Sequence, residues 1–209
     1  MKNLIIIDHP LVKRDLTLLR DKNTPSNIFR SVLRRTASLM AYEVTRDLTL
    51  QKISVATPLE KTQGYRVGDP FILVPILRAG LGLVGGFVEV LPDARVGHVG
   101  LYRDEETLKP VDYYLKLPKK IARAQVFILD PMLATGGSAV AAVKVLKNKG
   151  AKKIRFVSLV AAPEGVKALT KAHPDVTIYT CALDRQLNSK GYILPGLGDA
   201  GDRIFGTAE

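Results

Sequence analysis

The sequence predicts an α/β protein in which a mostly parallel sheet carries helices on both faces. Short apolar runs predict strands at residues 71–76, 96–101, 126–129, 154–160 and 176–179. Helical patterns at residues 81–91, 138–149 and 164–172 lie among these runs, an alternation that is typical of parallel strands joined by helices. Because ligands bind beyond the carboxyl ends of the strands in such sheets, functional residues are expected directly after each apolar run.

The first seventy residues have a mainly helical pattern. Thr24 followed by Pro25 predicts a helix start. Apolar residues then recur at helical spacing through residue 47, namely Ile28, Val32, Leu33, Leu39, Met40 and Val44. No internal repeat, low-complexity tract or linker-like stretch interrupts the chain, so residues 1–209 are expected to form a single domain.

Composition narrows the possible functions. The chain of 209 residues is 46% hydrophobic and carries a net charge of +11, without a basic arm or tail. Only 6% of its residues are aromatic and none is Trp; with no nucleic-acid reading motif either, a nucleic-acid partner is not expected. No apolar run reaches the roughly 18 residues of a membrane span, which predicts a soluble, cytoplasmic protein without a membrane partner.

Cysteine usage is also informative, because Cys181 is the only cysteine. A single cysteine excludes an internal disulfide and a multi-thiolate metal site, and it fits a reducing compartment. Cys181 lies in VTIYTCAL at residues 176–183, a pattern that predicts a buried strand. A nucleophilic role for this thiol is therefore disfavoured.

The first candidate site follows the run at 126–129 and reads DPMLATGGS at residues 130–138. Glycines before a helix let backbone N–H groups face an anion, and the Thr135 and Ser138 hydroxyls add donors at the positive end of the helix dipole. This favours phosphate, with Asp130 placed near sugar hydroxyls or a magnesium ion. The alternative is a simple connection in which Ser138 caps the helix and Gly136 and Gly137 make the bend. The stretch alone does not decide between the two.

The second candidate site follows the run at 71–77 and reads RAGLGLVGG at residues 78–86. Its glycines match G-x-G-x-x-G, with Asp104 at a suitable distance downstream, so a dinucleotide site competes here. Pro75 in the strand and Arg78 before the first glycine weaken that hypothesis, and an arginine beside glycines suits a diphosphate. A third interpretation is that the glycines only let a helix pack on the sheet. The three glycines are Gly80, Gly82 and Gly85.

The third candidate site reads GYILPGLGDAGDRIF at residues 191–205. It repeats G-x-G-x-x-G at Gly196, Gly198 and Gly201, but only eight residues follow Gly201, so no βαβ unit fits. A glycine-rich backbone with Asp199 can wrap a small planar ligand. The alternative is a C-terminal tail that covers an edge of the sheet.

Together the three loops resemble the uracil phosphoribosyltransferases. DPMLATGGS resembles the phosphoribosyl diphosphate (PRPP) signature of type I phosphoribosyltransferases, in the variant with proline as the second residue. The stretches VPILRAGLG at 74–82, LYRDEETLKP at 101–110 and YILPGLGDAGDR at 192–203 are similar to that family in particular. HPLVKRDLTLLRDKNT at 9–24 is similar as well, so the resemblance covers essentially the whole chain. Gly85 and Glu105 depart from the family pattern, where an acid and a proline are common.

The resemblance implies the type I phosphoribosyltransferase fold, with a base-binding hood formed by N- and C-terminal segments. It implies that uracil and PRPP react to give UMP and diphosphate in pyrimidine salvage. The implied PRPP-binding residues are Arg78, Arg103, Asp130, Pro131, Met132, Leu133, Ala134, Thr135, Gly136, Gly137, Ser138 and Asp199. The implied uracil-binding residues are Ile193, Gly198, Asp199 and Ala200, and the catalytic residues are Arg78, Arg103, Asp130 and Asp199.

Mg²⁺ would arrive bound to PRPP, without a metal site built from the protein. The resemblance also implies a homodimer or homotetramer and admits GTP as an effector. No residue is predicted to act as a general base for N1 of uracil. One rival hypothesis is a non-catalytic regulator that binds PRPP or nucleotides and grips RNA or DNA; Arg78, Arg103 and the complete uracil loop argue against it. The other, a nicotinamide-dependent oxidoreductase, has little support once all three loops are considered.

Overall fold

The structure is a computed structural model that describes residues 3–103 and 110–207. In this part of the chain the main sheet has the strand order β1-β11-β10-β8-β4-β6-β7, with β5 paired to β4 and β9 paired to β10. Its pairings are parallel except that of β6 with β7, which confirms the predicted sheet. The strands are β1 (Leu4–Ile6), β4 (Phe71–Leu77), β5 (Arg95–Val96), β6 (His98–Arg103), β7 (Pro110–Lys116), β8 (Gln125–Leu129), β9 (Met132–Leu133), β10 (Lys153–Ala161) and β11 (Thr177–Leu183).

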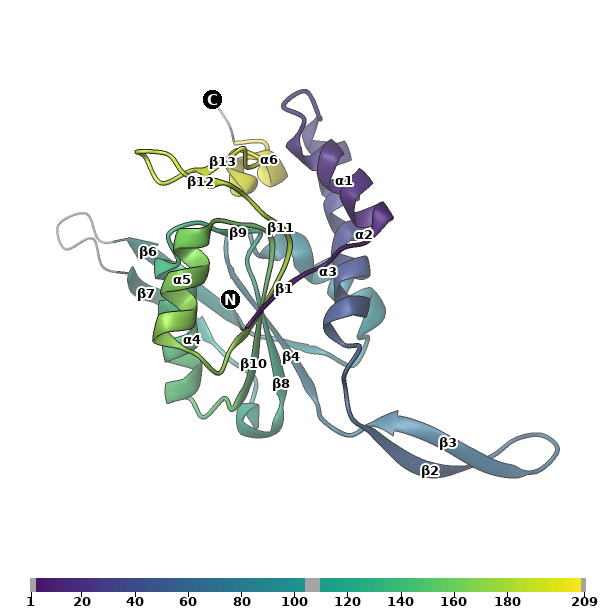
Figure 1. Cartoon of the computed structure of the whole chain (residues 1–209). Helices are drawn as coiled ribbons and strands as arrows, with labels where there is room; N and C mark the ends of the chain where they lie inside the picture. The colour runs from purple at the N-terminus through teal and green to yellow at the C-terminus, as the bar shows by residue number, and fades with distance from the viewer. Residues whose placement is uncertain (1–2, 104–109, 208–209) are drawn as a thin grey trace.

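Helices cover both faces of this sheet (Figure 1). One face carries α1 (Pro10–Arg20), α2 (Ser26–Val44) and α3 (Leu81–Val90), and the other carries α4 (Gly137–Asn148) and α5 (Pro163–Ala172). A short 3-10 helix, Ile121–Arg123, precedes β8. These positions confirm the predicted alternation from residue 71 onward.

Strand β8 shows why its sequence is continuously apolar. Phe127 and Leu129 belong to the core beneath α1, α2 and α3, whereas Val126 and Ile128 belong to the core beneath α4 and α5. All residues of β8 are buried. A central parallel strand covered on both faces has no polar side, so alternation disappears from its sequence.

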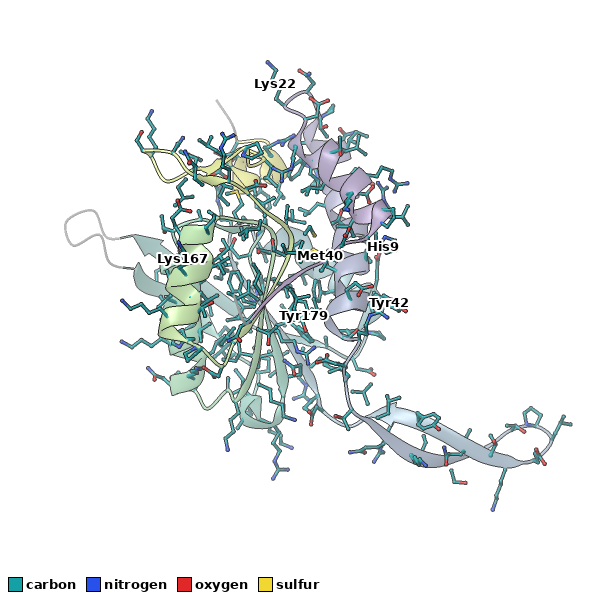
Figure 2. All side chains as sticks on the ribbon, viewed as in Figure 1. His9, Lys22, Met40, Tyr42, Lys167 and Tyr179 are labelled. Atoms are coloured by element: carbon teal, nitrogen blue, oxygen red, sulfur yellow. The ribbon has the colours of Figure 1, made fainter. Side chains whose placement is uncertain are left out.

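The helical prediction for residues 24–47 is also confirmed, since Pro25 caps α2 and the helix continues to Val44. Its apolar stripe faces the sheet. Met40 and Tyr179 are almost fully buried between α2 and β11, while Lys22 and Lys167 point outward (Figure 2). The predicted spacing therefore identified the packed face of this helix.

The expectation of a mainly helical first seventy residues is wrong for residues 50–67. Strands β2 (Leu50–Ala56) and β3 (Lys61–Val67) form an antiparallel hairpin that extends away from the body of the protein (Figure 1). Only Ile53 and Gly64 are partly buried in it. A ribbon exposed on both faces has no hydrophobic period, which is why the pattern did not reveal it.

The C-terminal part of the chain lies above the carboxyl ends of the strands, near α1 and α2 (Figure 1). The C-terminal part contains the short pair β12 (Gln186–Leu187) and β13 (Ile193–Leu194), followed by α6 (Ala200–Phe205). Arg30 of α2 donates a hydrogen bond to the carbonyl of Ile204 at 2.9 Å. The N- and C-terminal segments thus form one cover over the edge where ligands are expected.

Candidate active site

The loops after β4 and β8 lie side by side because their strands are neighbours. Leu73 of β4 pairs in register with Phe127 of β8, and β8 pairs in turn with β10. The segment after β11, the neighbour of β10, begins the C-terminal cover. The three stretches singled out from the sequence therefore belong to one edge of the sheet, as the crossover rule for parallel strands predicts.

The loop after β8 is held against β10 before it enters α4. The backbone N–H of Asp130 donates to the carbonyl of Val157 at 3.1 Å. Pro131 does not line the pocket described below; its carbonyl accepts the N–H groups of Leu159 and Val160 at 3.0 and 3.2 Å. The loop is therefore fixed at the point where a phosphate would bind.

A small pocket of about 80 Å³ lies inside this loop. A water molecule occupies about 30 Å³ in the liquid, so the pocket suits a compact polar group rather than a nucleobase. It opens at the start of α4, where backbone N–H groups and the helix dipole favour an anion. The lining residues are Asp130, Met132, Leu133, Ala134, Thr135, Gly136, Gly137, Ser138 and Ala139.

The two glycines of the loop have different tasks. Gly136 has φ +85°, and a Cβ there would lie 2.9 Å from the carbonyl oxygen of Gly165 in α5. Gly137 has no positive φ, and a Cβ there would meet only the Thr135 hydroxyl, at 3.8 Å. Gly136 is therefore required by the fold, whereas the space beside Gly137 belongs to the pocket.

Gly165 is a residue that the sequence analysis missed. A Cβ on Gly165 would lie 2.4 Å from the carbonyl oxygen of Ala134. The absence of a side chain lets α5 approach the phosphate loop from behind, in contact with backbone atoms. No sequence pattern marks it, because the need for glycine arises from a contact with a distant part of the chain.

The environment of Asp130 changes its acidity. Desolvation by burial, with a smaller contribution from the negative charge of Asp199, raises the pKa of the Asp130 carboxyl to about 7. A weak hydrogen bond opposes this rise in pKa: the backbone N–H of Met132 donates to the Asp130 carboxylate at 3.4 Å. Among the described residues Asp130 has no cationic partner. A ligand that brings hydroxyl donors or positive charge would complete this site.

The loop after β4 begins with an exposed arginine, which is followed by two tightly packed glycines, Gly80 and Gly82. A Cβ on Gly80 would lie 2.3 Å from the carbonyl oxygen of Leu129, and one on Gly82 would strike the Leu33 and Ile204 side chains. Gly85 is exposed, and a Cβ there would make only ordinary contact with the Arg34 side chain, at 3.6 Å. The geometry therefore supports the packing interpretation for Gly80 and Gly82, whereas nothing in the packing requires glycine at position 85.

Arg78 precedes these glycines and its side chain is 59% exposed. Its Nη2 lies 3.3 Å from Oδ1 of Asp202, and its guanidinium lies 5.8 Å from the centre of the Phe205 ring. Both partners belong to α6 of the C-terminal cover. The predicted diphosphate arginine is thus beside the predicted base loop, and it is exposed enough to reach a ligand.

The C-terminal loop places Asp199 and Ala200 at the start of α6. The Asp199 carboxylate caps this helix by accepting the N–H of Asp202 at 3.0 Å. Gly198 has φ +78°, a conformation that favours glycine. Ile193 is 6% exposed and belongs to the core, so its side chain packs internally and only its main chain is available to a ligand.

Arg103 is the last residue of β6, whose pairing with β4 brings Val99 opposite Ile76. Its backbone therefore ends at the same edge as the other loops. Its side chain lies outside the described residues, as do residues 104–109 with Asp104 and Glu105. The expected role of Arg103 stays a prediction.

The described residues offer neither a reactive cysteine nor a metal cluster as an alternative catalytic centre. Burial raises the pKa of Cys181 to about 12, so its thiolate is not formed near neutral pH. Within residues 3–103 and 110–207, no three His, Cys, Asp or Glu side chains gather as metal ligands. No helix in the same ranges has the length and apolarity needed to cross a membrane.

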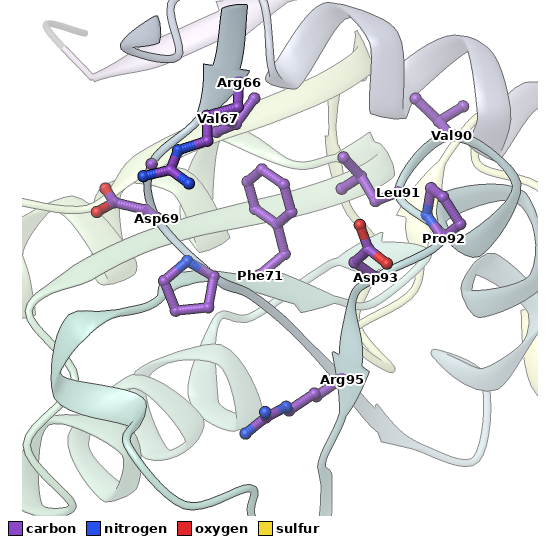
Figure 3. Close-up of a pocket in the computed structure, with 11 residues that line it drawn as sticks. Arg66, Val67, Asp69, Phe71, Val90, Leu91, Pro92, Asp93 and Arg95 are labelled. Atoms are coloured by element: carbon purple, nitrogen blue, oxygen red, sulfur yellow. The ribbon is translucent and has the colours of Figure 1, made fainter. Parts of the chain in front are cut away.

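A larger cavity, of about 640 Å³, lies elsewhere, at the base of the β2–β3 hairpin (Figure 3). Phe71 and Leu91 contribute apolar surface to it, while Arg66 and Arg95 contribute cationic groups. Phe71 begins β4, so this cavity opens at the amino ends of the strands. It is therefore on the edge opposite the three loops.

Comparison with solved structures first defines the class. A hypoxanthine-guanine phosphoribosyltransferase from Bacillus anthracis has the same fold with a TM-score of 0.52 and 12% identity, over 76% of this chain and 80% of its own. A solved protein from Aquifex aeolicus is much more similar, with a TM-score of 0.93 and 36% identity over 98% of this chain and 99% of its own. The fold is that of the type I phosphoribosyltransferases.

Sequence comparison then defines the family. Residues 6–207 match the family model described as uracil phosphoribosyltransferase. The chain is 60% identical over 208 residues to a uracil phosphoribosyltransferase from Polaromonas naphthalenivorans, covering 99% of this chain and 100% of the relative. It is 59% identical over 203 residues to one from Pediococcus pentosaceus, covering 97% of each. The chain belongs to the uracil phosphoribosyltransferase family.

Proposed function

We propose that this protein is a pentosyltransferase that converts uracil and PRPP to UMP and diphosphate, acting in pyrimidine salvage. The observation that carries the proposal is geometric: the glycine loop with the small pocket at the start of α4 and the C-terminal loop that begins after β11 belong to one edge of the sheet. The first is the loop proposed to bind phosphate and the second is the loop proposed to bind uracil. Two substrates held by these two loops would meet at the reacting carbon.

In this proposal residues 134–138 bind the 5-phosphate of PRPP, and the Asp130 carboxylate accepts hydrogen bonds from the ribose hydroxyls. Arg78 and Arg103 approach the diphosphate. Backbone groups of Ile193, Gly198 and Ala200 hold uracil, and Asp199 lies close to both substrates. Support comes from the pocket at the start of α4 and from the contact of Arg78 with Asp202 of the base loop segment.

The chemistry requires little covalent participation by the protein. The bond between C1 of the ribose and the diphosphate breaks as positive charge develops on the ring and negative charge develops on the leaving oxygens. N1 of uracil attacks from the opposite face. Holding both partners in line can supply roughly 7–11 kcal/mol of the barrier reduction, and fixed arginines stabilise the leaving group.

Mg²⁺ fits this site as a companion of PRPP. A hard cation prefers oxygen ligands and keeps several from its substrate, and Asp130 offers a desolvated carboxylate without a cation of its own among the described residues. When bound, the ion would neutralise charge on the diphosphate. Titration of PRPP affinity with Mg²⁺, in wild type and Asp130→Asn, tests this part.

The direct experiment is UMP formation from radiolabelled uracil with PRPP and Mg²⁺, assayed beside cytosine, hypoxanthine and adenine. Product from uracil alone supports the proposal. Turnover of a purine in its place would overturn it. PRPP binding without turnover of any base would instead indicate the non-catalytic regulator, which the family relationship does not favour.

We further propose one domain over residues 1–209 and a cytoplasmic homo-oligomer. The β2–β3 hairpin supports association: Leu59 is 95% exposed, Tyr65 is 57% exposed and Leu50 is 55% exposed. The cavity at its base presents charges of both signs from Arg66, Asp69, Asp93 and Arg95 (Figure 3), as a self-complementary two-fold interface requires.

Light scattering tests the oligomer. A mass that is a multiple of 22.8 kDa is expected for the wild type, and a Tyr65→Asp variant should reduce it. An unchanged mass in Tyr65→Asp would exclude the hairpin as the contact. GTP is proposed as an effector from family resemblance, and initial rates with and without GTP test that point.

A further inference from the structure

The proposed uracil loop is held by an ion pair between two residues that are not among the proposed substrate-binding residues. Arg20 is the last residue of α1 and its guanidinium binds both carboxylate oxygens of Asp184, at 2.9 and 2.6 Å. Asp184 directly follows β11, and its side chain is 5% exposed. The N-terminal helix is thereby fixed to the end of a central strand.

The same ion pair binds the peptide groups of Gly196. Nη1 of Arg20 donates to the carbonyl oxygen of Gly196 at 2.7 Å. Oδ2 of Asp184 accepts the N–H of Gly196 at 2.9 Å. Both backbone groups of one loop residue are thus held by two opposite charges, an arrangement that fixes position as well as orientation.

Gly196 transmits this position to the rest of the loop. Its φ is +63°, and a Cβ there would lie only 2.2 Å from the carbonyl oxygen of Ile193. Residues 193 and 196 are therefore in close backbone contact, and a shift at Gly196 must move Ile193. Residues 198–200, proposed to bind uracil, follow directly.

A second arginine holds the other side of the same turn. Arg203 Nη1 donates to the carbonyl of Leu197 at 2.9 Å and to that of Leu19, while Nη2 donates to the carbonyl of Asp21 at 2.6 Å. Its guanidinium stacks 4.4 Å from the centre of the Phe29 ring. Residues 196 and 197 are thus fixed to the C-terminal end of α1.

We propose that Arg20 and Asp184 are positioning residues for the base: they set the main-chain geometry of residues 193–198 and so determine uracil affinity. PRPP is bound mainly by the loops after β4 and β8, and Asp199 is held separately as the N-cap of α6. The inference rests on the proposed function, because it names the substrate that this loop holds. A structural role alone would explain a fall in stability but would not distinguish between the two substrates.

The chain contains a matched control at the opposite edge of the sheet. Arg155 of β10 binds both carboxylate oxygens of Asp47, at 2.6 and 3.2 Å, and also donates to the carbonyl of Val44. Like Arg20, it makes two contacts to an aspartate and one to a backbone carbonyl, although the Asp47 side chain is 66% exposed and that of Asp184 only 5%. It fixes the end of α2 and does not touch the uracil loop.

The experiment compares Arg20→Lys and Asp184→Asn with Asp47→Asn in the full-length protein. KM for uracil, kcat, the Kd of PRPP by calorimetry and the melting temperature are measured for each. Arg20→Lys and Asp184→Asn should raise KM for uracil by about tenfold to a hundredfold, the scale expected when a ligand-binding group is misplaced by about 1 Å. The Kd of PRPP should change by less than about twofold, and Asp47→Asn should leave both constants unchanged.

An equal loss of uracil and PRPP affinity, or an unchanged KM for uracil, would overturn the inference. If Asp184→Asn does not fold, the milder Arg20→Lys decides, since lysine keeps the charge but its single ammonium group cannot hold both Asp184 oxygens and the Gly196 carbonyl as the guanidinium does. Absence of UMP formation by the wild type would instead contradict the proposed function, so the two failures are distinguishable.

Discussion

The negative charge of Asp199 acts on Asp130 across the site, although Asp130 follows a strand of the sheet and Asp199 caps α6. Burial first, and this charge to a smaller extent, disfavour the ionised form of Asp130 and raise its pKa to about 7. Such an arrangement costs stability unless a ligand compensates it. The cost is therefore concentrated at the place where the proposed substrates meet.

Replacement of Asp130 by asparagine should stabilise the ligand-free protein above pH 7. The pKa of Asp130 rises from 3.8 to about 7 on folding, so the folded state binds an extra proton between these values and stability falls as pH rises through them. Asp130→Asn removes this dependence. The expected gain at pH 8 is roughly 2 kcal/mol, about half of the full linkage value because Asp130 is partly exposed.

Thermal melting of both proteins from pH 4 to pH 8.5 measures this difference. The gain should vanish toward pH 4, where the wild-type carboxyl is also neutral. Parallel curves for the two proteins over the whole range would contradict the assigned pKa. UMP formation by Asp130→Asn should fall sharply in the same preparations.

The two glycines of the phosphate loop should respond differently to substitution. Gly137→Val should abolish PRPP binding with little loss of stability, because its side chain would enter the pocket and its backbone has no positive φ. Gly136→Ala should lower stability by about 1 kcal/mol or more, because φ is +85° and Gly165 is close. Calorimetry with PRPP and thermal melting separate the two effects, and unchanged PRPP binding by Gly137→Val would remove this loop from the site.

The elements that the sequence predicted are those buried on both faces. Strands β4, β8 and β10 have nearly uninterrupted buried runs, so their apolar stretches stand out. The hairpin β2–β3 is exposed on both sides, and β12 and β13 have two residues each. The hairpin strands are long enough but too exposed, and β12 and β13 are too short, to leave a periodic pattern.

The candidate site likewise contains some residues that a local sequence pattern identifies and others that it does not. Gly136 and Gly137 could be identified because phosphate loops use local glycines and a following helix. Arg20, Asp184 and Gly165 could not, because each acts through a contact with a distant part of the chain. The G-x-G-x-x-G match at residues 80–85 shows the converse, because Gly80 and Gly82 serve close packing of the chain.

Arg78→Ala should impair catalysis far more than stability. Among the described residues its one ion pair, with Asp202, is 3.3 Å long and exposed, and such pairs contribute about 0–1 kcal/mol. Loss of a charge-assisted contact to the diphosphate should cost about 2 kcal/mol or more in kcat/KM. Arg34→Ala is the control, because Arg34 is similarly exposed at 61% and is paired with Glu89. Equal kinetics for the two variants would exclude Arg78 from the site.

Arg103→Ala should also lower kcat/KM by about 2 kcal/mol or more, roughly thirtyfold. The reason is its place at the carboxyl end of β6, next to the end of β4. Arg95→Ala provides the comparison, since Arg95 lines the cavity at the opposite edge. Steady-state kinetics with PRPP as the varied substrate measure both; wild-type kinetics in Arg103→Ala would contradict its assignment to the diphosphate.

Discrimination between uracil and cytosine should come from the backbone of residues 193–200. This loop offers few side chains suited to a pyrimidine edge: Ile193 is buried, and Asp199 is engaged as a helix cap. Uracil presents an acceptor, a donor and an acceptor at O2, N3–H and O4, so a backbone carbonyl can accept N3–H while the N–H of Ala200, unused within α6, can donate to O4.

Cytosine reverses the last two of these groups. Its N3 would face a carbonyl and its amino group would face an N–H, which leaves buried polar groups unpaired at roughly 1–3 kcal/mol each. Two such mismatches predict a kcat/KM for cytosine at least about a hundredfold below that for uracil. Competition between the two bases for UMP formation measures the ratio directly. Comparable rates would contradict recognition by the backbone, because a main-chain donor and acceptor cannot exchange roles.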